Sequence, residues 1–95
     1  MKLAVLTLNL RLHGCDSLKA KRSRLKPMLA RLRREFNVSV AEVASQDSWQ
    51  EAVVACALIS GERGHAERSL EKVVGWLERH YPDEMIVSNS IEVID

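Results

Sequence analysis

The sequence has few cysteine, proline, glycine and aromatic residues, so it does not resemble a small protein stabilised by disulfides or a typical cofactor-binding protein. Its 95 residues include only two cysteines, two prolines, four glycines and four aromatic side chains. The cysteines are 41 positions apart, which excludes a CxxC pair and favours two reduced thiols over a disulfide framework. No apolar run approaches the roughly 18 residues of a membrane span. The composition therefore predicts one ordinary globular domain over residues 1–95.

Recognisable catalytic motifs are also missing. Gly61 and Gly64 match neither GxGxxG nor GxxxxGK[ST]. His13, Cys15 and Asp16 lie close together in the chain, but a zinc site needs three or four converging ligands and Asp16 falls in a turn. Neighbouring cations could favour a Cys15 thiolate, yet nothing else completes a catalytic triad. We expect no metal, no cofactor and no enzymatic activity.

The first twelve residues alternate with a period of two. The even positions from Ala4 to Leu12 are all apolar, whereas the odd positions turn polar from Thr7 onward. This alternation is typical of a strand with one buried face. It argues against a lipoprotein signal ending at Cys15, because a signal needs an unbroken apolar stretch of about 7–15 residues. We therefore expect a cytoplasmic protein.

Two apolar stripes at spacings of three and four predict helices that end near Phe36 and Tyr81. The start of the first helix has two interpretations, because a proline in mid-helix costs roughly 3 kcal/mol. A start capped by Ser23 puts Pro27 in the first turn and is favoured, and a start at Ser17 with a kink is the alternative. Three further strands are predicted, at residues 37–45, 49–60 and 84–95.

The predicted order of elements is β-α-β-β-α-β. The short turn at 46–48 indicates an antiparallel hairpin, and the single apolar stripe of each helix indicates that both helices cover one face of one sheet. This arrangement is the α+β, ferredoxin-like sandwich with a four-stranded antiparallel sheet. Leu3 and Val5 would lie on the uncovered face, which favours a homodimer through the open sheet face.

Residues 17–60 closely resemble the YlxP-like family of small bacterial proteins. The matching parts are "SLK", "KR", "FNVSVAEV" and "QD" followed by "WQ", and the rest of the chain matches in outline. The resemblance implies a ferredoxin-like fold and no particular chemistry, since the family is functionally uncharacterised. The family's genes often lie near those for ribosome-maturation and translation-initiation factors, which suggests work linked to the ribosome.

The net charge of +1 hides a division along the chain. Residues 1–36 have ten basic and two acidic side chains, whereas residues 37–95 have four basic and eleven acidic ones, so the net charges are +8 and −7. Like charges at helical spacing destabilise a helix, and a phosphate-binding surface would explain that cost. Solubility, or pairing with the acidic part of the same molecule, is the alternative explanation. The candidate RNA-binding residues are Lys19, Lys21, Arg22, Arg24, Lys26, Arg31, Arg33 and Arg34.

These observations favour a small non-enzymatic protein that binds structured RNA, with ribosome association, through the basic loop and the first helix. We do not expect bases to stack on the central strands, as they do in the RNA-recognition motif. Strands 2–12 and 49–60 contain no Phe or Tyr, and their only aromatic residue is Trp49 at a strand edge. Binding would instead be shape-driven and salt-sensitive. The alternative is a dimeric regulatory or interaction module that binds a small molecule or a protein through its sheet.

Overall fold

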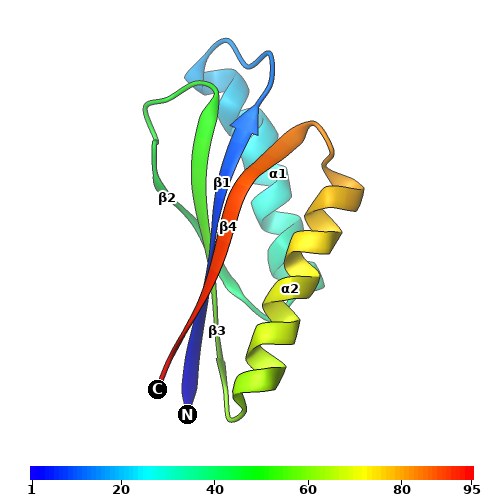
Figure 1. Ribbon diagram of the computed structural model, residues 1–95. Coiled ribbons are helices and arrows are strands. Elements are labelled where there is room, and N and C mark those ends of the chain that lie inside the picture. The colour runs from blue at the N-terminus through cyan, green and yellow to red at the C-terminus, as the bar shows by residue number, and fades with distance from the viewer.

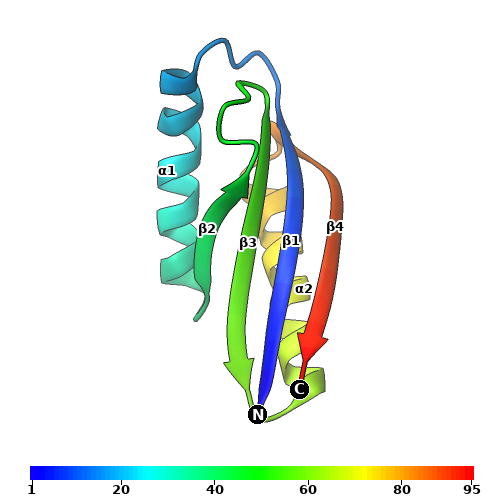
Figure 2. The ribbon, with the colours of Figure 1, turned by 90° about the vertical axis from the view of Figure 1, so that its left-hand side faces the viewer.

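The computed structural model describes residues 1–95 as a single sheet covered by two helices (Figure 1). The elements are β1 (Lys2–Leu12), α1 (Leu18–Glu35), β2 (Ser39–Ala44), β3 (Glu51–Ser60), α2 (Arg63–His80) and β4 (Glu84–Ile94). The strands are antiparallel and lie in the order β2-β3-β1-β4. Figure 2 shows the uncovered face of this sheet, with α1 along edge strand β2 and α2 behind the other strands. The predicted ferredoxin-like α+β sandwich is confirmed.

Strand β1 is central in the sheet, because it pairs with β3 on one side and with β4 on the other. From Ala4 onward its even residues are buried under the helices and its odd residues point to the open face, as the period of two predicts. The register places Cys56 of β3 directly opposite Leu6 and Val54 opposite Leu8, so the buried layer continues across the centre of the sheet.

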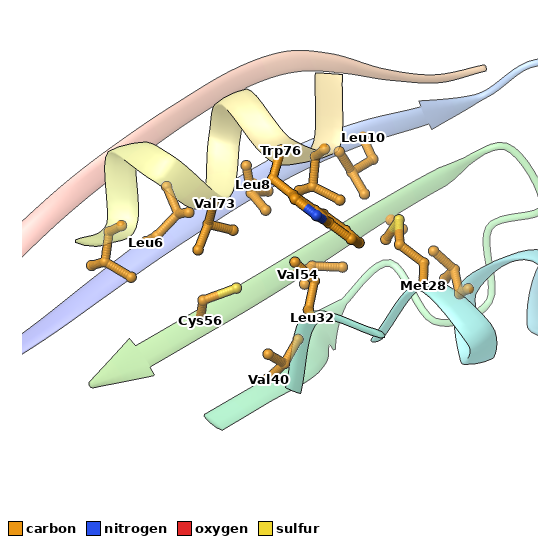
Figure 3. Packing of buried hydrophobic residues seen from close by; sticks show 14 of the residues in the cluster. Leu6, Leu8, Leu10, Met28, Leu32, Val40, Val54, Cys56, Val73 and Trp76 are labelled. Carbon is orange, nitrogen blue, oxygen red and sulfur yellow. The ribbon is translucent and has the colours of Figure 1, made fainter. Parts of the chain in front are cut away.

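The core lies where both helices meet this buried layer (Figure 3). Met28 and Leu32 of α1 and Val73 of α2 are fully buried there. Trp76 of α2 is only 7% exposed. Its ring meets Phe36 edge to face at 6.0 Å between centroids, so this indole joins the end of α1 to α2.

Helix α1 begins at Leu18, so the favoured start at Ser23 is wrong and the alternative start at Ser17 is right. The Ser17 hydroxyl accepts a hydrogen bond from the Ala20 backbone N–H at 3.0 Å, as an N-cap does. Pro27 therefore lies inside the helix. The cap and the contacts of the first two turns outweigh the backbone hydrogen bond that Pro27 cannot make.

Candidate nucleic-acid interface

Lys21 was expected on the basic surface, but the structure places its side chain inside the molecule, where it is 2% exposed. Its ammonium lies 2.8 Å from Glu42 Oε2 and donates to the carbonyl oxygens of Ser45 at 2.7 Å and Ser48 at 2.8 Å. An ammonium has three N–H donors, and three oxygens surround this one. Because its ammonium is buried among these three oxygen atoms, Lys21 is not part of the exposed basic surface.

Arg24 and Arg31 lie seven residues apart on the side of α1 that faces α2 and β4, and both have partners there. Arg24 pairs with Glu84 at 2.7 Å and donates to the His13 carbonyl oxygen at 2.7 Å. The Arg31 guanidinium lies over Trp76, 5.0 Å from the ring centroid, and donates to the Tyr81 hydroxyl at 3.4 Å. These contacts hold the two helices and β4 together.

Four other cations form a line along α1, which we call the basic stripe. On a helix with 100° per residue, Lys19, Arg22, Lys26 and Arg33 fall within about 60° of one another. All four are exposed, and the stripe runs from Lys19 to Arg33, a separation of 14 positions or about 21 Å of helix axis at 1.5 Å per residue. Arg34 is exposed on the adjoining outer surface.

The basic stripe has almost no partners in the protein. Lys19, Arg22 and Lys26 make no ion pair and no side-chain hydrogen bond, and Arg33 makes one bond, to the Val40 carbonyl oxygen at 2.7 Å. Pairing with the acidic part of the chain therefore accounts for Lys21 and Arg24 but not for the stripe. Its charges remain available to an external anion.

The basic stripe runs beside edge strand β2 and the loop that follows it. A small cavity of about 100 Å³ is lined by Arg22 and Lys26 of the stripe together with Glu42 of β2 and Gln46 of the β2–β3 loop. Figure 1 shows the start of α1 and the β2–β3 loop at the same end of the molecule, opposite both chain termini. The stripe and this loop thus form one continuous edge.

The open sheet face carries an apolar line at its other end. Leu3 of β1 lies directly opposite Ile59 of β3 and opposite Ile94 of β4. All three side chains are exposed, and Ile59 is 70% exposed. This line crosses the three strands close to the chain termini.

His13, Cys15 and Asp16 are close together in the chain but differ in burial. Cys15 is buried, with its Sγ donating to the Ser17 carbonyl oxygen at 3.7 Å, whereas His13 and Asp16 are exposed. Burial raises the pKa of the Cys56 thiol to about 11. No group of three or more His, Cys, Asp or Glu side chains is arranged to hold a metal ion.

The fold and this edge define a small ferredoxin-like domain with a basic helix face that is largely unpaired. Comparison with known proteins places it more narrowly. Residues 3–90 match the family described as a protein of unknown function, DUF503, and the chain belongs to that family. It is 36% identical over 67 residues to the uncharacterized protein YlxP of Bacillus subtilis (strain 168), a match that covers 70% of this chain and 73% of that protein. Neither helix is long and apolar enough to cross a membrane.

Proposed function

We propose that this protein is a non-enzymatic, cytoplasmic RNA-binding protein that contacts the phosphates of structured RNA, with ribosome association, through the basic stripe and Arg34. The observation that carries the proposal is the stripe itself. Its four cations are exposed and lie in line, and only Arg33 makes a hydrogen bond within the protein. Lysine and arginine side chains along one face of a helix suit a row of phosphates, and arginine can also bind a phosphate bidentately.

Two of the arginines expected to bind RNA are instead engaged within the protein, which separates them from the exposed stripe. Arg24 and Arg31 are held by Glu84, Trp76 and Tyr81, so their charges stabilise the fold before any partner arrives. In the stripe, by contrast, only Arg33 makes a side-chain contact of this kind, its hydrogen bond to the Val40 carbonyl oxygen. Like charges at spacings of three and four weaken a helix, and an anionic partner would offset this repulsion.

The proposal is tested by reversing three charges of the stripe together, Lys19→Glu, Arg22→Glu and Lys26→Glu. The variant should lose sedimentation with small ribosomal subunits at low salt and lose binding to a structured RNA measured by fluorescence anisotropy. Arg24 and Arg31 are left unchanged, because replacing them would also disturb the packing of α2 and β4.

A matched control comes from helix α2. The substitutions Arg68→Glu, Lys72→Glu and Arg79→Glu change the net charge equally and affect exposed residues that make no ion pair. RNA binding of this control should fall far less than that of the stripe variant. Equal losses would mean that net charge alone drives binding, and unchanged binding of the stripe variant would contradict the proposal.

A second candidate, a homodimeric interaction module, is favoured by the apolar line on the open sheet face. Leu3, Ile59 and Ile94 adjoin one another across three strands, and a second copy of the same face would cover them. Sedimentation equilibrium should then detect a dimer that Ile59→Lys dissociates. Ala30→Lys, which adds the same charge on the exposed surface of α1, should leave it intact. A wild-type monomer at all concentrations would exclude this candidate.

A further inference from the structure

Trp49 is the exposed aromatic residue of the β2–β3 loop. Its side chain is 53% exposed, makes no aromatic or cation–π contact and does not belong to the hydrophobic core. Burying a tryptophan ring normally contributes strongly to a core. A tryptophan left in solvent by a small protein with so few aromatics is available to another molecule.

The backbone on both sides of Trp49 is fixed. The carbonyl oxygen of Ser48 accepts from the buried Lys21 ammonium at 2.8 Å, and that of Gln50 accepts from the Leu12 backbone N–H at 2.8 Å. The Ser48 hydroxyl also accepts from the Glu51 N–H at 3.2 Å. Trp49 therefore stands between two anchored residues, and little backbone conformational entropy is lost when its ring meets a ligand.

The loop is held in an unusual shape by the same contacts. Ser45 has a φ of 61°, in the left-handed region that non-glycine residues seldom occupy. Its carbonyl oxygen accepts from Lys21 at 2.7 Å and from the Ser48 backbone N–H at 3.0 Å. Lys21 thus fixes the loop from inside, while Arg22, the next residue, points outward with the basic stripe.

This geometry combines an exposed indole on an anchored backbone with the first cations of the basic stripe at one end of the molecule. The loop that carries Trp49 adjoins the stripe, because Gln46 of the same loop shares a cavity with Arg22 and Lys26. Cations beside an aromatic ring are the arrangement that binds single-stranded nucleic acid, since bases stack on the ring while the cations hold the backbone. The paired bases inside a perfect duplex are unavailable for such stacking.

We infer that Trp49 stacks on an unpaired base of the bound RNA, so that this protein prefers RNA with a loop or bulge over a continuous duplex. The inference rests on the proposed RNA-binding function and adds the class of RNA. It places stacking on the β2–β3 loop instead of the central strands, where no aromatic residue is present.

The test uses the full chain with two RNAs of equal length, a hairpin with an unpaired loop and a perfect duplex. The hairpin should bind more tightly and quench tryptophan emission, with buried Trp76 providing a constant background. Trp49→Ala should weaken hairpin binding by at least about fivefold and remove the preference over the duplex. Trp49→Phe should retain most of the preference, because a phenyl ring also stacks.

Val43→Ala serves as the matched control, because Val43 is another exposed apolar residue of the same hairpin. It should leave both affinities unchanged. If wild-type protein binds both RNAs equally and Trp49→Ala alters neither affinity, the stacking inference is wrong while the stripe proposal stands. If neither RNA binds wild-type protein at low salt, both proposals are overturned.

Discussion

The ammonium of Lys21 and the carboxylate of Glu42 meet at 2.8 Å inside the protein, joining α1 to edge strand β2. Glu42 Oε2 is buried and has no hydrogen-bond partner elsewhere. The same ammonium closes the β2–β3 loop through two carbonyl oxygens. One buried cation thus determines the position of the loop beside the basic stripe.

Lys21→Ala should lower the free energy of unfolding by about 3 kcal/mol, because breaking a buried ion pair leaves its partner uncompensated. Urea denaturation followed by circular dichroism measures the change. Lys19→Ala, two residues earlier on the exposed surface, should change stability by less than about 0.5 kcal/mol. Similar effects of the two substitutions would show that the Lys21 contacts contribute little.

Salt should weaken RNA binding in proportion to the number of phosphates neutralised. Each contact contributes about 0.7–0.9 to the slope of log K against log salt, so replacing Lys19, Arg22 and Lys26 by Ala should reduce the slope by about 2–3. Anisotropy titrations at several salt concentrations measure both slopes. An identical slope for variant and wild type would place the phosphate contacts elsewhere.

Pro27→Ala should raise the free energy of unfolding by about 2 kcal/mol, because it restores an N–H inside α1 and replaces a poor helix former with the best one. Pro82→Ala provides the comparison, since Pro82 lies beyond the end of α2 and interrupts no helix. Thermal and urea unfolding of both variants measure the difference. A loss of stability in Pro27→Ala would mean that the ring of Pro27 makes contacts worth more than the helix gain.

Cys56 should make stability depend on pH in the alkaline range. Burial raises the pKa of its folded thiol from 9.0 to about 11. The free energy of unfolding is unaffected by this thiol below pH 9.0 and falls as the pH rises toward about 11. The reason is that the thiol ionises at a lower pH in the unfolded chain than in the folded protein. The decline in unfolding free energy over this window should be shallower in Cys56→Ala than in wild type. Parallel curves would contradict the raised pKa.

The fold could be predicted because its signals are local. The period of two in β1 and the apolar stripes of α1 and α2 follow from backbone geometry, and short connections then restrict the topology. The start of α1 could not be decided in this way. A penalty for Pro27 competes with a cap at Ser17 and with buried contacts of Lys21 and Leu25, which exist only when β2 and the following loop are in place.

The sequence predicted which residues of the first helix are basic, but not how the fold arranges their side chains. The charge division of the chain identified the basic helix, yet eight cations of similar appearance have different roles. Lys21 is buried with Glu42, Arg24 is paired with Glu84, and the Arg31 guanidinium lies over the ring of Trp76.

The sequence by itself determined the order of strands and helices, the buried face of β1 and the excess of positive charge on the first helix. These properties depend on periodicity and composition, which any segment carries within itself. Only the tertiary structure decided which cations are free and that Trp49 stays exposed on an anchored loop. The physical reason is that a cation is buried or forms an ion pair only when the fold brings an acceptor close to it. Glu42 and Glu84, the acceptors for Lys21 and Arg24, come from distant segments of the chain.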